Sequence, residues 1–150
     1  GMELYTNVIN MSGNNRLGEV TKRKETLVSD TIDWGRILAT KHANGRDWWI
    51  MVPENSTNSF YVWLLDINGV HLIRKQRVGV PVEEGLGQVA FSPDGRYYVK
   101  AKSTRIGEFP QFDLYDFTDW NGFCFAQRCH DAANIGLPPS RQRRPVLSGA

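Results

Sequence analysis

The fold of this chain is decided by the stretch Asn44-Gly45-Arg46-Asp47-Trp48-Trp49-Ile50-Met51-Val52, in which a turn is followed by aromatic and aliphatic residues. Fifty positions later comes a related stretch, Asp94-Gly95-Arg96-Tyr97-Tyr98-Val99-Lys100-Ala101. The same offset relates Leu64-Leu65-Asp66 to Leu114-Tyr115-Asp116. Two independent matches at one offset indicate an internal repeat of about fifty residues.

Within each repeat, the sequence predicts short antiparallel strands separated by tight turns. Asn44-Gly45 and Asn68-Gly69 favour two-residue hairpin turns, because both positions of such a turn need a positive φ. We expect strands at residues 37–42, 47–53, 60–67 and 70–78 in the first repeat, and at 88–92, 96–102 and 111–117 in the second. Successive antiparallel strands form a meander, and a period of about fifty residues is typical of a β-propeller blade.

The segment before residue 30 matches half a repeat, with a strand at 4–11, a long turn at 12–18 and a charged outer edge strand at 19–29. Apolar residues at helical spacing do not persist over any window of about 11 residues. The predicted fold class is therefore all-β, a partial β-propeller of about two and a half four-stranded antiparallel blades. Residues 1–130 would form it, with a half blade at 4–29 and blades at 35–80 and 87–130.

The tail at 131–150 is rich in proline and arginine and contains no Phe, Trp or Tyr. A segment of this composition lacks the apolar surface that would order it, so we expect it to be disordered or ordered by a partner. We also expect strand patterning to be lost after Phe117. This change suggests a fragment, or a change of reading frame near residue 120.

The composition excludes several classes of partner. The chain has 150 residues, with 18 Lys and Arg against 16 Asp and Glu, and its net charge of +2 shows no basic excess of the kind that favours nucleic-acid binding. No apolar run approaches the roughly 20 residues that cross a membrane, and no signal peptide is visible. Two cysteines are too few for a disulfide framework, so stability must come from packing.

The residues around the first turn are the candidate binding site. Lys41, His42, Arg46 and Asp47 could form a polar site on one rim of a propeller. The alternative is that Arg46 and Asp47 only decorate the hairpin, while His42 makes a local hydrogen bond. Trp48 and Trp49 are adjacent, so on a strand they point to opposite faces. One is expected to be core, and the other either packs on the next blade or offers a flat surface to a sugar.

Other chemical candidates are weak. Cys124, Cys129 and His130 lack a fourth zinc ligand, so we expect no metal and no cofactor, although a Cys124–Cys129 disulfide stays an alternative. No catalytic motif is present, and turn flexibility explains Gly85-Leu86-Gly87. Asp116 and Asp119 could form a carboxylate pair, but sequence does not place them across a substrate. The chain is therefore not expected to be an enzyme.

Two segments carry a resemblance to a known family: Lys41-His42-Ala43-Asn44-Gly45-Arg46-Asp47-Trp48-Trp49 and Phe91-Ser92-Pro93-Asp94-Gly95. They resemble the WD-repeat-like β-propeller domains of secreted Bacteroidota proteins associated with gliding-motility (type IX) secretion. Residues 14–20 and 85–88 are also similar to family segments, and the resemblance covers roughly residues 4–117. It implies a secreted or cell-surface location and a larger parent protein.

The expected function is a noncatalytic module that binds a protein or a glycan through its loops or rim. One alternative is a propeller-based hydrolase acting on a glycan or peptide, and another is a truncated product without selected function. Convergent carboxylates in a deep cleft would favour the hydrolase, whereas a surface lined by Trp and Tyr would favour binding. A partial propeller exposes blade faces and strand edges, so we expect a homo-oligomer, with a dimer favoured.

Overall fold

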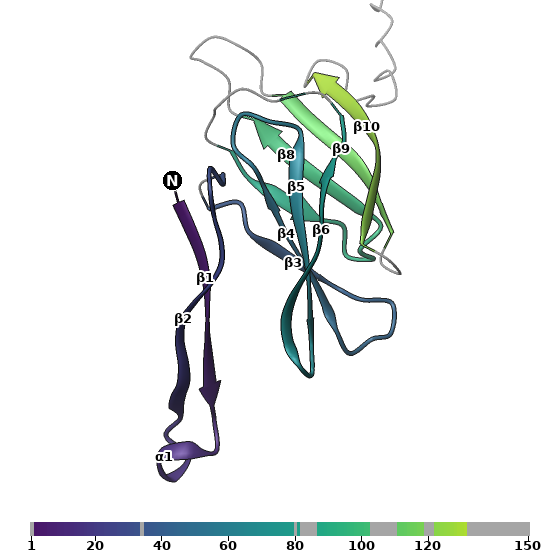
Figure 1. The fold of residues 1–150 in the computed structure, drawn as a ribbon. Coiled ribbons are helices and arrows are strands. Elements are labelled where there is room, and N and C mark those ends of the chain that lie inside the picture. The colour runs from purple at the N-terminus through teal and green to yellow at the C-terminus, as the bar shows by residue number, and fades with distance from the viewer. Residues whose placement is uncertain are drawn as a thin grey trace, which may run out of the picture.

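The chain folds almost entirely as β-strands in the computed structural model, which describes residues 2–33, 35–79, 81, 87–102, 111–118 and 122–131. One short helical turn, α1 (Gly13–Arg16), joins the first two strands (Figure 1). The strands are β1 (Met2–Asn10), β2 (Glu19–Asp30), β3 (Leu38–Lys41), β4 (Trp48–Pro53), β5 (Ser59–Asp66), β6 (Gly69–Arg77), β7 (Val89–Phe91), β8 (Tyr97–Lys102), β9 (Gln111–Thr118) and β10 (Phe123–Asp131).

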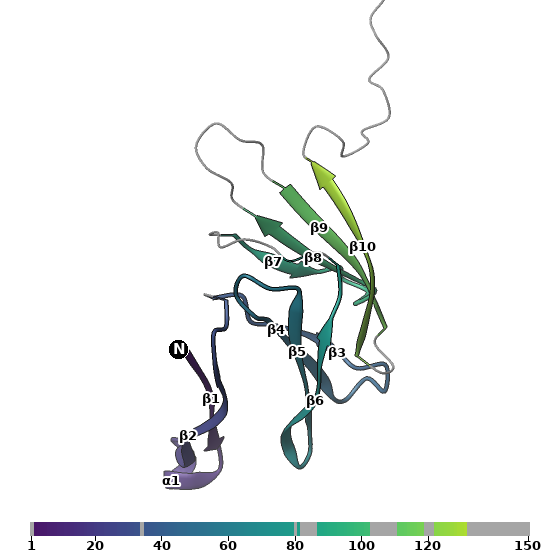
Figure 2. The same cartoon turned by 45° about the horizontal axis from the view of Figure 1, so that its top comes forward.

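The described strands form three antiparallel sheets. β1 and β2 form a two-stranded hairpin, β3–β4–β5–β6 form the middle sheet, and β7–β8–β9–β10 form the third sheet. Each four-stranded sheet is a meander in which neighbours along the chain are neighbours in space. Figure 2 shows the two meanders stacked and the hairpin beside the middle sheet. The prediction of an all-β fold is confirmed, and none of the described sheets closes on itself.

The first hairpin turn of each meander has the same hydrogen bonds. In the turn at 42–47, the N–H of His42 donates to the carbonyl of Asp47 at 2.9 Å. The N–H of Gly45 donates to the carbonyl of His42, also at 2.9 Å. The turn at 92–97 repeats both bonds at 2.9 Å, with Gly95 as the second donor. Both glycines have the positive φ that such a turn requires, 72° and 70°. The fifty-residue offset in sequence therefore corresponds to a repeated turn in space.

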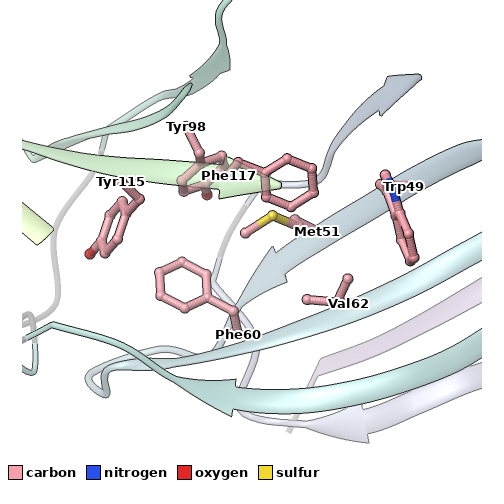
Figure 3. Close-up of a cluster of buried hydrophobic side chains, with 7 residues drawn as sticks. All are labelled: Trp49, Met51, Phe60, Val62, Tyr98, Tyr115 and Phe117. Carbon is pink, nitrogen blue, oxygen red and sulfur yellow. The ribbon is translucent and has the colours of Figure 1, made fainter. Parts of the chain in front are cut away.

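The main core lies between the middle and third sheets (Figure 3). Strands β4 and β5 contribute residues to it from one side, and β8 and β9 contribute aromatic rings from the other. Its buried members are Trp49, Met51, Phe60, Val62, Tyr98, Tyr115 and Phe117. The rings of Phe60 and Tyr115 meet edge to face, with centroids 5.3 Å apart.

A second core lies on the opposite face of the middle sheet, against the base of the hairpin. Its buried members are Ile32, Val52, Tyr61 and Trp63, and Met2, Leu4, Leu27 and Val28 pack against them. Successive residues of β4 serve different cores because side chains alternate across a strand. The middle sheet therefore packs on both faces, against the hairpin on one side and the third sheet on the other.

The prediction that strand patterning is lost after Phe117 is wrong. Strand β10 pairs antiparallel with β9, from Phe123 opposite Thr118 to Asp131 opposite Gln111. The turn before it uses the positive φ of Gly122, 66°, and the N–H of Gly122 donates to the carbonyl of Thr118 at 2.8 Å. Asn121-Gly122 is the same hairpin signal as Asn44-Gly45, so the strand was visible in the sequence. The expected loss of strand patterning, which suggested a change of reading frame near residue 120, does not occur.

The turn at 12–18 and the segment from residue 131 differ in part from the predictions. The long turn at 12–18 contains α1, whose residues Asn14 and Asn15 adopt left-handed φ values of 47° and 54°. Asp131 belongs to β10 rather than to a disordered tail, and residues 132–150 lie outside the described part of the chain.

Candidate binding site at the repeat turns

The six predicted site residues lie at one end of the middle sheet. Lys41 ends β3, His42 opens the turn, Arg46 and Asp47 close it, and Trp48 and Trp49 begin β4. Lys41 pairs with Trp48 across the ladder, so these two side chains share a face. The sequence placed all six residues in one neighbourhood, and the structure divides them into different roles.

Trp49 is a core residue. Its side chain is only 3% exposed, and its ring lies 5.1 Å from that of His42. Gly122 packs directly on the indole, because a Cβ at that position would lie 2.9 Å from two ring carbons. Trp48 points to the other face and is 39% exposed, so it is the member of the pair that a ligand could reach.

Asp47 organises the turn. Its carboxylate accepts hydrogen bonds from Arg46 Nε at 2.7 Å and from Asn44 Nδ2 at 2.6 Å. These bonds, that of Arg46 foremost, lower the pKa of Asp47 to about 2. Asn44 Oδ1 accepts from the backbone N–H of both Arg46 and Asp47 at 3.0 Å, and His42 Nδ1 accepts from the N–H of Asn44 at 3.0 Å. The hairpin is therefore held by local hydrogen bonds of His42, Arg46 and Asp47, as expected if these residues stabilise the turn and do not bind a ligand.

Lys41 and Trp48 lie in a surface depression of about 460 Å³ between the two repeat turns. We call it the turn depression; its lining residues are Thr40, Lys41, His42, Ala43, Trp48, Pro93, Asp94 and Gly95. Lys41 Nζ lies 5.8 Å from the centroid of the Trp48 ring, within cation–π range. Hydrogen bonds from Ser92 and the backbone of Arg96 lower the pKa of Asp94. The depression thus combines an aromatic ring with a cation on one turn and an anion on the other.

Sequence reasoning missed a buried ionic cluster at the opposite end of the sheets. Arg36 donates a hydrogen bond to Asp33, and Lys100 Nζ lies 3.5 Å from the same carboxylate. Asp113 is buried on β9, directly opposite Lys100 in the ladder. Burial lowers the pKa of Lys100. No spacing rule marks these residues, because Asp33 and Arg36 precede the middle sheet whereas Lys100 and Asp113 belong to the third.

Gly87 is explained by close packing, which corrects the prediction of turn flexibility. A Cβ on Gly87 would lie 2.0 Å from the carbonyl oxygen of Ala101 and 2.7 Å from a guanidinium nitrogen of Arg36. The carbonyl of Gly87 also accepts a long hydrogen bond, 3.4 Å, from Arg36 Nε. Residues 82–86, which include Gly85 and Leu86, lie outside the described part of the chain.

A third polar cluster joins β2 to β6 on the surface. Lys75 Nζ lies 2.7 Å from Glu54 and 3.4 Å from Asp30, and its charge sits 4.6 Å from the centroid of the Tyr61 ring. The Tyr61 hydroxyl donates to Asp30, and this bond is the main reason why the pKa of Asp30 falls to about 2. These carboxylates are engaged in ion pairs, which are stabilising contacts between the hairpin and the middle sheet.

Within the described ranges, no group of three or more His, Cys, Asp or Glu residues could hold a metal ion. The zinc and disulfide alternatives fall on side chains of β10 that are not described, and Asp119 of the carboxylate pair is also outside the described residues. Among the helical residues that the structure describes, none belongs to a helix of the length and apolarity that a membrane span needs.

Comparisons of the chain with protein-family models, with curated proteins and with solved structures found no match. The resemblance to WD-repeat-like propellers, and the secreted location that it implies, stay predictions.

Proposed function

We propose that this protein is a noncatalytic interaction module, a partial β-propeller that binds a glycan in the turn depression. The observation that carries the proposal is the indole of Trp48, 39% exposed, in a depression that Lys41 of β3 and Asp94 of the next repeat turn also line. The resemblance of these turns to those of secreted propellers agrees with a ligand met outside the cell.

The chemistry of the turn depression suits a sugar. The C–H face of a sugar ring is apolar and packs on an aromatic ring, while its hydroxyl groups need hydrogen-bond partners at the edge. Lys41 supplies donors beside the ring, and the carboxylate of Asp94 supplies an acceptor on the facing turn. A protein ligand would be favoured by a broad apolar patch, whereas this site has one aromatic ring within a polar rim.

The stacked repeats support the propeller interpretation. The turns at 42–47 and 92–97 have matching hydrogen bonds, and the third sheet packs on one face of the middle sheet through the main core. Stacked repeats bury their faces against neighbours in this way. The ligand surface then lies at the rim, where consecutive turns come together.

Binding of the full chain to an array of immobilised neutral and acidic oligosaccharides tests the proposal. We expect saturable binding to a subset of glycans, lost in Trp48→Ala and reduced at least about tenfold in Asp94→Asn, which removes a charge-assisted hydrogen bond. Tyr5→Ala is the matched control, because Tyr5 is an exposed aromatic residue on the distant hairpin. Equal binding by Trp48→Ala and the unaltered chain would overturn the glycan site. Cleavage of a bound glycan, seen by mass spectrometry, would overturn the noncatalytic function.

A further inference from the structure

We infer that the free edge of β1 is a docking site for an extended peptide segment, which adds to the hairpin as a third strand. The site is the slot of about 270 Å³ between β1 and the residues that lead into β3. It shares no lining residue with the turn depression, so the two sites are independent.

The two edges of the hairpin differ in their protection against pairing. Strand β2 carries six charged side chains, Glu19, Lys22, Arg23, Lys24, Glu25 and Asp30, whereas β1 carries one, Glu3. Charged side chains, lysine above all, are a common means of blocking an exposed edge. Among the described strands, β1 pairs with β2 alone, so its other edge is open and lacks this protection.

The slot is lined by apolar residues together with Glu3, Asp33 and Arg36, and its apolar part continues an existing interface. Met2 and Leu4 form one wall, and Ile32, Ile37 and Val52 lie opposite. Four of these five residues belong to the second core, whereas Ile37 is 50% exposed at the point where the hairpin ends. The contact between hairpin and middle sheet therefore stops before it covers the start of β3, and an added strand would extend it across this exposed residue.

The repeat identifies what fits the slot. In both four-stranded sheets, the third strand has the second strand at its side: β5 pairs with β4, and β9 pairs with β8. Among the described strands the hairpin lacks this neighbour, and the slot beside β1 is the space that it would enter. A strand with alternating apolar side chains would fill it and would satisfy the backbone groups of β1.

A second copy of the chain does not fit this position. Antiparallel pairing of β1 with its own copy places the two-fold axis normal to the joined sheet, so both middle sheets would lie on the same face. Each middle sheet is four strands wide and would overlap the other, because the hairpin beneath it has only two strands. A separate extended segment has no such conflict. The register shift between Leu4 and Tyr5 places its extra residue, Leu27, on β2, so it does not interrupt the backbone of β1.

The test uses the whole chain and a fluorescein-labelled peptide with the sequence of residues 96–102, Arg-Tyr-Tyr-Val-Lys-Ala-Lys, a second strand of the repeat. Fluorescence anisotropy should show saturable binding. A strand that pairs along one edge uses the N–H groups of alternate residues only. N-methylation of one alternating set should therefore weaken binding at least about tenfold, and N-methylation of the other set should leave it unchanged.

Variants of the chain test the apolar part of the slot. Ile37→Asp should weaken peptide binding at least about tenfold, because it places a charge in this apolar part. Leu72→Asp is the control, since Leu72 is also exposed but lies outside the slot. No binding at millimolar peptide, an equal effect of the two methylated sets, or unaltered binding by Ile37→Asp would each overturn the inference. The methylated peptides need no variant protein, so the test does not depend on whether Ile37→Asp folds.

Discussion

Arg36 and Asp33 form a buried ion pair in the segment that leads into β3, with the ammonium group of Lys100 of the third sheet beside the same carboxylate. Both side chains of the pair are almost completely shielded from water. Removing Arg36 takes the shorter of these two contacts away from the buried Asp33 carboxylate, and loss of a partner from a buried charge is costly.

Arg36→Leu should therefore lower the free energy of unfolding by about 3 kcal/mol or more, measured by urea denaturation at pH 7. Lys22→Met is the control, because the Lys22–Glu25 pair at 3.5 Å is exposed and its loss should change stability by less than about 1 kcal/mol. Equal effects of the two substitutions would show that the buried cluster is not a stabilising contact.

Gly87→Ala should also destabilise the chain, because the added methyl group would overlap the carbonyl oxygen of Ala101. We expect a loss of about 1–3 kcal/mol in the free energy of unfolding, as for other overpacked sites. The exposed neighbour Ala90 serves as control, and Ala90→Ser should be close to neutral. Unchanged stability in Gly87→Ala would contradict the close approach.

The two adjacent tryptophans should respond differently to truncation. Trp49→Ala removes a buried indole and should cost about 3–5 kcal/mol in unfolding free energy. Trp48→Ala removes a ring that is 39% exposed, so it should cost less than about 1 kcal/mol while it removes glycan binding. A large loss of stability in Trp48→Ala would instead assign Trp48 to packing.

The stability of the first turn should depend on pH in the acid range. The pKa of Asp47 is about 2 in the folded chain, below its ordinary value of 3.8, so its ionised form stabilises the folded state above pH 4. This contribution is lost as the pH falls from about 4 through about 2, and Asp30 behaves in the same way.

Asn44→Ala removes one of the three side-chain hydrogen bonds to the Asp47 carboxylate and should raise the pKa of this carboxyl toward 3.8, as measured by NMR titration. Urea midpoints between pH 2 and 6 should then begin to fall at a higher pH in the variant. Asn7→Ala, a change on the distant hairpin, should leave the titration of Asp47 unaltered. A pKa near 3.8 for Asp47 in the unaltered chain would contradict the turn network.

We also expect the chain to self-associate, with a dimer as the favoured state. A groove of about 880 Å³ separates the outer part of the hairpin from the β5–β6 turn, and its walls include the exposed residues Val8, Ile9 and Ile67. Exposed apolar surface of this kind drives association. Light scattering should give a mass above that of the monomer, and Ile67→Lys should lower it, whereas Ile73→Lys on β6 should not. A stable monomer at micromolar concentration would contradict the expectation.

The strands could be predicted from the sequence because their causes are local. The predicted strands 47–53 and 60–67 correspond to β4 and β5 to within one residue at either end. Alternating apolar residues and Asn-Gly or Asp-Gly turns set these boundaries without help from the rest of the chain. The predicted blade at 87–130 contains nearly all of β10, whereas the expected loss of strand patterning after Phe117 is contradicted by this strand, which follows the turn signal Asn121-Gly122.

The candidate site could be predicted only in outline. Asn44, Gly45 and Asp47 identify a tight turn from sequence, and the turn places Lys41 and Trp48 side by side across the ladder. That Asp94 lines the same depression depends on the stacking of the third sheet. The buried charges of Asp33 and Lys100 have no sequence signal, because each resembles a solvated residue until the two sheets close over it.

The amino-acid sequence by itself determined the repeat, the turns and the alternation of side chains along each strand, because these depend on backbone geometry over a few residues. Only the tertiary structure decided which face of each strand is covered. Trp48 and Trp49 have the same chemistry and adjacent positions, yet one is buried by the third sheet and the other is left at the surface. Burial depends on what packs against a face, and that neighbour is supplied by residues distant in the chain.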